Sequence, residues 1–158
     1  MEIKAGEILF LDTNVLLTAT DRSRPDHLSA RRLLSLARRG GFHLAVSGQV
    51  VREYLVVATR PTNANGLGLG VPDALRNVAQ FRRRTVLLDE NEAVSNRLTA
   101  LIASCATAGK RIHDANIVAT MLTHGIALLV TQNREDFEGF PGIRTGGATE
   151  SLRAVEGT

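Results

Sequence analysis

Acidic residues stand at four places where a folded chain could bring them together, each just past an apolar run or near the start of a helix. They are Asp12, Glu53, Asp114 and Asp136. Two unit charges about 4 Å apart repel by about 4 kcal/mol at an effective dielectric near 20, so such a cluster needs a cation. Ligands made only of oxygen favour Mg2+ or Mn2+. Such an ion activates water for attack on phosphorus, so the pattern indicates metal-assisted hydrolysis.

Apolar segments alternate with amphipathic segments along most of the chain, which predicts a single α/β domain. Strands are expected at residues 7–11, 42–46, 85–88, 126–131 and 141–145. Helical segments are expected at residues 15–19, 25–40, 47–59, 73–84, 90–108, 113–124 and 133–140, with a Gly- and Asn-rich loop at 60–72. This order predicts a three-layer α/β/α domain with a central, mainly parallel sheet over residues 1–145. Residues 146–158 are expected to form a polar tail that frays.

The parallel arrangement places the four acidic residues at one edge of the predicted sheet. Ligand sites in such folds lie beyond the carboxyl ends of the strands, where Asp12 follows the first strand and Glu53 lies in the helix after the second. The helix from Asp114 rises roughly 18 Å and the next strand returns roughly 20 Å, so Asp114 comes back beside the turn that carries Asp136. The alternative interpretations are a helix cap for Asp12 or Asp114, a surface position for Glu53, and an ion pair of Asp136 with Arg134.

Composition limits the classes of protein to which the chain can belong. Its 158 residues fit one domain, and 44% of them are hydrophobic and 22% charged, which is typical of a globular protein. The apolar runs are too short for a membrane span and no signal peptide is evident, so a cytoplasmic location is expected. The single cysteine, Cys105, excludes an internal disulfide and a thiolate metal cluster.

Arginine supplies most of the positive charge, with 17 Arg against 2 Lys and a net charge of +3. This balance suits a phosphate-rich partner, although genome composition explains the total count equally well. The apolar periodicity of residues 25–40 puts four arginines off the buried face of that helix, namely Arg31, Arg32, Arg38 and Arg39. They form either a solvated face or part of a groove for a nucleic-acid backbone.

Four motifs carry a resemblance to a known family. They are LFLDTNVLL at residues 9–17, SGQVVREYL at 47–55, IHDANIVATML at 112–122 and VTQNREDFEGF at 130–140. In this order and spacing they resemble the PIN-domain ribonucleases, and most of all the VapC toxins of type II toxin–antitoxin pairs. The resemblance implies a nuclease that uses Mg2+, or Mn2+, and cleaves RNA. It also implies a homodimer and a small antitoxin that often offers an arginine to the carboxylates.

The resemblance assigns roles to the first three acidic positions. Asp12 matches the first metal carboxylate, and Thr13 and Asn14 match its polar neighbours. Glu53 matches the second acidic position and Asp114 the third.

The fourth acidic position departs from the family pattern. The family often has an acid where this chain has Asn133, and a second acid before the phenylalanine, where the chain has Asp136. Asp136 is therefore expected to complete the metal set, with Asn133 as a neutral ligand or substrate contact. Thr131 is expected to support the site through hydrogen bonds. The asparagine lowers the charge of the site by one, which leaves open whether one or two ions bind.

The sequence thus predicts an Mg2+-dependent endoribonuclease that cleaves single-stranded or structured RNA, with Asp12 and Asp114 as metal ligands and Glu53 and Asp136 orienting water. A haloacid-dehalogenase-type phosphatase would need a second Asp where this chain has Asn14. A response-regulator receiver would need an acidic pair after the first strand and a lysine near a later strand end, and no lysine is placed there. The remaining alternatives are a non-catalytic RNA-binding or regulatory partner and a PIN nuclease of RNA maturation.

Overall fold

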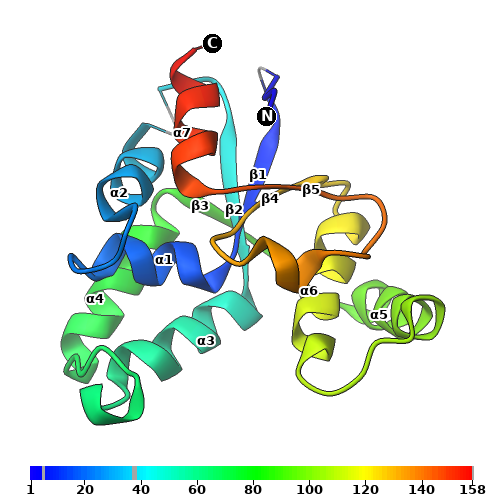
Figure 1. Cartoon of the computed structure of the whole chain (residues 1–158), viewed down its shortest axis with the longest axis horizontal. Helices are drawn as coiled ribbons and strands as arrows, with labels where there is room; N and C mark the ends of the chain where they lie inside the picture. The colour runs from blue at the N-terminus through cyan, green and yellow to red at the C-terminus, as the bar shows by residue number, and fades with distance from the viewer. Residues whose placement is uncertain (5, 37–38, 158) are drawn as a thin grey trace.

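A five-stranded parallel sheet forms the centre of the molecule, whose computed structural model describes residues 1–4, 6–36 and 39–157 (Figure 1). The strands lie in the order β3, β2, β1, β4, β5. Their bounds are β1 Ile8–Leu11, β2 His43–Ser47, β3 Thr85–Leu88, β4 Leu128–Val130 and β5 Arg144–Gly146. Because β1 pairs with both β2 and β4, Leu9 lies between Leu44 and Leu128. The predicted α/β fold with a parallel sheet is confirmed.

Helices pack in two groups on the two sides of the sheet. The first group comprises α1 (Thr13–Thr20), α2 (His27–Leu36), α3 (Gly48–Thr59), α4 (Val71–Arg82) and α7 (Ala148–Glu156). The second comprises α5 (Glu92–Cys105) and α6 (Arg111–Thr123), which Figure 1 shows across the sheet from the first group. Two 3-10 turns, η1 (Thr62–Ala64) and η2 (Arg134–Phe137), lie in the connections.

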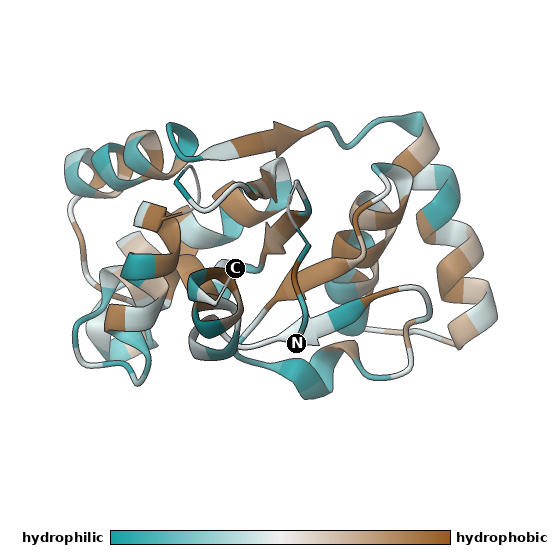
Figure 2. Ribbon diagram, turned by 90° about the horizontal axis from the view of Figure 1, so that it is seen from above, coloured by the Kyte–Doolittle hydropathy of each residue, from teal (hydrophilic) through white to brown (hydrophobic). Residues whose placement is uncertain are grey.

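The central strand supplies much of the core. Leu9, Phe10 and Leu11 of β1 are fully buried, as expected for an apolar strand that is covered on both faces. Figure 2 shows the hydrophobic colour on the strands and the hydrophilic colour on many outward helix surfaces. The apolar run stops at Asp12, so the first polar side chain after β1 lies at the carboxyl edge of the sheet. None of the described helices is both long enough and apolar enough to span a bilayer.

Several predicted boundaries shift for local reasons. The helix expected from residue 25 begins at His27, because Asp26 has φ +64°, a left-handed conformation that a helix cannot include. The helix expected from residue 73 begins two residues earlier at Val71, with Pro72 in its first turn, where proline is favoured. The loop predicted at residues 60–72 therefore contains the 3-10 turn η1 and the start of α4.

The expectation of a fraying polar tail after residue 146 is wrong. Residues 148–156 form α7, whose inward residues Ala148, Ser151, Leu152 and Val155 are buried, and α7 packs against α2. Their spacing of i, i+3, i+4 and i+7 is that of an amphipathic helix, although a serine within the stripe weakens the pattern in the sequence. The boundary of the nuclease domain at residue 145 stays a prediction.

Candidate active site

Asp12 lies at the carboxyl end of β1 and is the N-cap of α1. The residue is only 7% exposed. Its Oδ1 accepts the backbone N–H of Thr13 at 2.7 Å, and its Oδ2 accepts hydrogen bonds from Asn14 Nδ2 and Thr131 Oγ1, both at 2.8 Å. Helix capping requires only the bond from the N–H of Thr13. It does not explain the hydrogen bonds from Asn14 and Thr131. The carboxylate is held in one orientation and keeps lone pairs for a further ligand.

Glu53 projects from α3 toward the start of α1 and is half-buried. Thr13 Oγ1 donates to its Oε2 at 2.7 Å, and Gln49 Nε2 donates to its Oε1 at 2.7 Å. Gln49 precedes Glu53 by four residues, so both side chains lie on one face of α3. The surface interpretation of Glu53 is therefore wrong, because Thr13 of α1 holds one carboxylate oxygen and Gln49 of α3 holds the other.

Thr131 joins the first strand to the turn that follows β4. Its hydroxyl donates to Asp12 and accepts from Asn14 Nδ2 at 3.2 Å and from the N–H of Asn133 at 3.0 Å. Asn14 Oδ1 in turn accepts the N–H of Gln132 at 3.0 Å. Asn133 therefore takes part in this hydrogen-bond network through its backbone N–H, and the residue is exposed to solvent. Thr13, Asn14 and Thr131 each hydrogen-bond to Asp12, and Asn133 hydrogen-bonds to Thr131.

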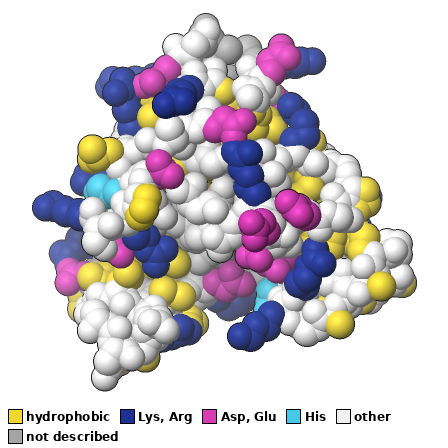
Figure 3. All heavy atoms as spheres, viewed as in Figure 1, with side chains coloured by type: hydrophobic (Ala, Val, Ile, Leu, Met, Phe, Trp, Pro, Cys, Tyr) yellow, Lys and Arg dark blue, Asp and Glu magenta, His cyan; other side chains and the backbone are white. Residues whose placement is uncertain are grey.

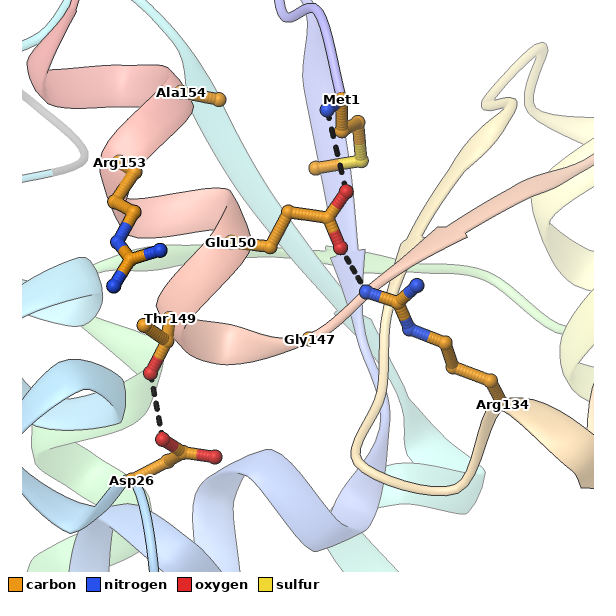
Figure 4. Close-up of a pocket in the computed structure, with 8 residues that line it drawn as sticks. All are labelled: Met1, Asp26, Arg134, Gly147, Thr149, Glu150, Arg153 and Ala154. Carbon is orange, nitrogen blue, oxygen red and sulfur yellow. Dashed lines mark hydrogen bonds and ion pairs between the residues drawn. The ribbon is translucent and has the colours of Figure 1, made fainter.

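Asp114 and Asp136 approach from the other side of the site. Asp114 lies in the first turn of α6, and Asp136 lies in η2, which packs against α6. Because α6 begins at Arg111, Asp114 is not its cap. Within the described part of the chain, neither carboxylate has a side-chain hydrogen bond. Arg134, the alternative partner of Asp136, instead forms an ion pair with Glu150 (Figure 4).

The four carboxylates form one electrostatically coupled group. Burial raises the pKa of Asp12 from its ordinary 3.8 to about 6, and the charges of Glu53 and Asp114 add to the increase, while hydrogen bonds oppose it. Burial likewise raises the pKa of Asp114 to about 6, with a further increase from the charges of Asp136 and Glu53. Figure 3 shows Asp and Glu side chains clustered low on the front face, with Lys and Arg side chains beside them.

The donor set has the chemistry that a hard cation prefers. Oxygen is the only donor type, and a cation beside Asp12 and Asp114 would oppose the increase in their pKa values. In the geometry of the described residues, no three Asp, Glu, His or Cys side chains are grouped closely enough to hold one ion. Mutual repulsion keeps like charges apart, so the side chains of Asp114 and Asp136 would have to turn inward to share an ion with Asp12.

Three residues outside the predicted set form a polar chain behind Glu53. Asn116 Nδ2 donates to Gln49 Oε1 at 2.7 Å and to Glu90 Oε1 at 2.8 Å, and Glu90 Oε2 accepts the N–H of Gln49 at 2.8 Å. Gln49 Nε2 also donates to the carbonyl of His113 at 2.9 Å, which ties α3 to the start of α6.

Two sequence signals point to this polar chain. Gln49 stands one helical turn before Glu53, and Glu90 follows β3 at the carboxyl edge of the sheet, as Asp12 follows β1. Since ligand sites in such folds lie beyond the carboxyl ends of the strands, the position of Glu90 also indicates a site residue.

The four arginines predicted as an RNA-binding surface have different surroundings where the structure describes them, and their role stays a prediction. Arg31 lines a cavity with Arg22 and Arg84. Arg32 forms an ion pair with Glu156 at 2.7 Å. Arg39 is exposed, and Arg38 lies outside the described residues.

Comparison with known proteins places the chain in a family. The profile of the PIN domain matches residues 9–142. The chain belongs to the PIN-domain family. It is 33% identical over 134 residues to Ribonuclease VapC24 of Mycobacterium tuberculosis, covering 84% of this chain and 91% of that protein. It is also 33% identical over 138 residues to Ribonuclease VapC48 of the same organism, covering 84% of this chain and 92% of that protein. The predicted resemblance to PIN-domain VapC proteins is confirmed.

Solved structures with a similar fold include toxin–antitoxin complexes. VapBC2 of Rickettsia felis, bound to a DNA fragment from its promoter, matches with a TM-score of 0.68 at 17% identity, covering 89% of this chain and 98% of that one. VapC20 of Mycobacterium tuberculosis, described as a sarcin–ricin loop cleaving toxin, matches with a TM-score of 0.63 at 16% identity, covering 86% and 98%. At these identities the likeness concerns the fold alone.

Proposed function

We propose that this PIN-domain protein is a metal-dependent endoribonuclease and the toxin of a type II toxin–antitoxin pair. The observation that carries the proposal is the coupling of Asp12, Glu53, Asp114 and Asp136 at the carboxyl edge of the sheet, in a chain whose relatives are named ribonucleases. Likeness to the VapBC structures supports an antitoxin as a partner. The reaction is hydrolysis of an RNA phosphodiester bond in the cytoplasm.

The role proposed for each carboxylate follows from the contacts of its side chain. Asp12 and Asp114 would hold Mg2+ or Mn2+, since both carboxylates have raised pKa values and free lone pairs. A divalent ion bound there would supply a nucleophile at neutral pH and would stabilise the negative charge that develops on the phosphoryl oxygens. Glu53, fixed by Thr13 and Gln49, orients the attacking water, and Asp136 completes the acidic set from the exposed side.

The same carboxylates also suit an inhibitory partner. A guanidinium group from an antitoxin would neutralise the cluster with hydrogen bonds in place of an ion, because its planar fork matches carboxylate geometry. Antitoxin binding and metal binding would then exclude each other. We propose that the protein is a homodimer, as its VapC relationship implies.

The decisive experiment is cleavage of a mixed pool of structured and single-stranded RNAs by the wild type, Asp12→Asn and Asp114→Asn, with Mg2+ or with EDTA. Asparagine keeps an oxygen that can accept the N–H of Thr13 and removes one charge, and circular dichroism shows whether each variant is folded. We expect cleavage only by the wild type and only with the metal, and the product ends identify the RNA target. Folded protein that binds RNA but never cleaves it would instead support the non-catalytic partner. Cleavage that persists in both variants would remove the carboxylates from the mechanism.

A further inference from the structure

Three surface cavities connect the carboxylate cluster to a set of arginines. The first, of about 660 Å³, is lined by Thr131, Asn133 and Asp136 and reaches Asp26. The second, of about 730 Å³, is also lined by Asp26 and extends to arginines beyond it. The third, of about 270 Å³, shares two of those arginines with the second. Because neighbouring cavities share lining residues, they form one path over the turn between α1 and α2.

The third cavity collects positive charge from three separate elements. Arg22 follows α1, Arg31 lies in α2, and Arg84 follows α4. All three residues are exposed. No ion pair joins any of them to a carboxylate in the residues that the structure covers, and no Asp or Glu stands among the described residues that line the cavity. We call this cavity the arginine pocket.

The floor of the arginine pocket is held by hydrogen bonds. Asn77 Nδ2 donates to the hydroxyl of Tyr54 at 3.0 Å, and the same hydroxyl lies 3.0 Å from Thr20 Oγ1. Tyr54 stacks edge-on against Phe81, with ring centroids 5.2 Å apart. His27 Nδ1 contacts the carbonyl of Thr18 at 2.8 Å. The exposed arginines therefore surround a fixed surface that includes amide groups able to hydrogen-bond a ligand.

Six arginines outside the arginine pocket form ion pairs with acidic side chains. They are Arg24 with Asp21, Arg32 with Glu156, Arg52 with Glu90, Arg76 with Asp73, Arg134 with Glu150, and Arg144 with Glu7. In Figure 4, Arg134 and Glu150 face each other near Gly147, and Asp26 bonds to Thr149 instead of to an arginine. The arginine pocket differs from these places because it gathers three arginines that have no ion pair within the described residues.

We propose that an RNA strand being cleaved extends from the carboxylate cluster along this path and places backbone phosphates in the arginine pocket. This inference rests on the proposed nuclease function. The strand must leave a cluster that repels its phosphates, and the path ends where guanidinium groups attract them bidentately. The helix α1 spans this interval in eight residues, about 12 Å at 1.5 Å per residue, so the pocket holds phosphates a few nucleotides from the cleaved bond.

The test compares two double variants that each remove two positive charges. Arg31→Gln with Arg84→Gln alters the arginine pocket, whereas Lys4→Gln with Arg97→Gln alters exposed positions before β1 and on α5. Affinity for a single-stranded RNA probe is measured in EDTA at several salt concentrations. Each lost phosphate contact should reduce the salt slope by about 0.7, so the pocket variant should lose about 1.4. Between 50 and 200 mM salt, its affinity should then fall about sevenfold less than that of the wild type and the control variant.

Cleavage with Mg2+ supplies the second measurement. The pocket variant should show a higher KM and an unchanged kcat, because its arginines lie away from the reacting atoms. A wild type that neither binds nor cleaves RNA would overturn both proposals. A wild type that cleaves RNA, beside a pocket variant with the wild-type salt slope, would overturn only the RNA path. In that case, loss of affinity for an oligoglutamate peptide would assign the pocket to an acidic protein segment instead.

Discussion

The two halves of the carboxylate cluster differ in how firmly the fold holds them. Asp12 accepts three hydrogen bonds and Glu53 accepts two, all between 2.7 and 2.8 Å. Asp114 and Asp136 have no side-chain hydrogen bonds within the described residues, and Asp136 is exposed. We refer to Asp12 and Glu53 as the fixed half and to Asp114 and Asp136 as the open half.

This difference indicates how the site is built. Groups that are already oriented need no reorganisation when charge develops, which makes them effective in catalysis. Groups without partners can adjust to an ion, a substrate or a protein partner. The fixed half lies between β1 and α1 and in α3, whereas the open half lies in α6 and η2. In the site, a pair of carboxylates oriented by hydrogen bonds thus lies opposite a pair that can change its orientation.

The largest effect is expected from neutralising the fixed half. Glu53→Gln should lower kcat by at least about 100-fold, because the oriented charge is lost. Glutamine preserves the contacts of the side chain, since the hydroxyl of Thr13 can rotate to accept a hydrogen bond. The measurement is the cleavage rate at saturating RNA and Mg2+, with thermal unfolding as a control for folding. A well-folded variant that cleaves at the wild-type rate would show that the charge of Glu53 is not used.

The second prediction concerns stability against pH when no divalent ion is present. The pKa of Asp12 is raised to about 6 in the folded protein, so the native state binds more protons than the unfolded state between the two pKa values. Stability should therefore fall as pH rises through this interval. Between pH 4.5 and 7 the wild type should lose about 2 kcal/mol relative to Asp12→Asn.

Urea unfolding in EDTA measures this difference, and Mg2+ added at pH 7 should restore stability to the wild type more than to the variant. If the free energy of unfolding depended on pH in the same way in the two proteins, burial would not raise the pKa of Asp12.

A smaller decrease in kcat is expected for substitutions of the residues that support Glu53, namely Gln49 and Asn116. Gln49→Ala should lower kcat about tenfold, at the low end of the 10- to 100-fold range for groups that orient a ligand, because Thr13 still holds one oxygen of Glu53. Asn116→Ala should act similarly, since its amide holds that of Gln49. The double variant should be little worse than either single variant, because both belong to one hydrogen-bonded chain. Additive losses would show that the two residues act independently.

The smallest effect is expected at Asp136, the exposed member of the open half. Asp136→Asn should lower kcat/KM by no more than about fivefold, because interactions of exposed charges contribute about 0.2–1 kcal/mol. Its pH profile should shift slightly, since the charge of Asp136 contributes to the raised pKa of Asp114. The measurement is kcat/KM against pH for the two proteins. A loss comparable to that of Glu53→Gln would show that the difference in hydrogen bonding between the halves does not predict their importance for cleavage.

The sequence by itself determined the order of the elements and the position of the site along them. Apolar runs that end in polar residues fix where strands stop, and parallel strands present those ends at one edge, so Asp12 could be placed from its neighbours alone. The spacing of helix and strand also placed Asp114 near η2, because the rise per residue is the same in any protein. The same argument about the carboxyl ends of strands also applies to Glu90, which follows β3.

Only the tertiary structure decided which side chains are fixed and which charges are compensated. The bonds from Asn116 to Gln49 and to Glu90 depend on how α3, α6 and the end of β3 meet, and sequence spacing does not encode those distances. The pairing of Arg32 with Glu156 depends on α7 folding back onto α2. The grouping of Arg22, Arg31 and Arg84 joins three elements for the same reason. Local periodicity states which face of a helix is buried, whereas the partner of a polar side chain is chosen by segments remote in the chain.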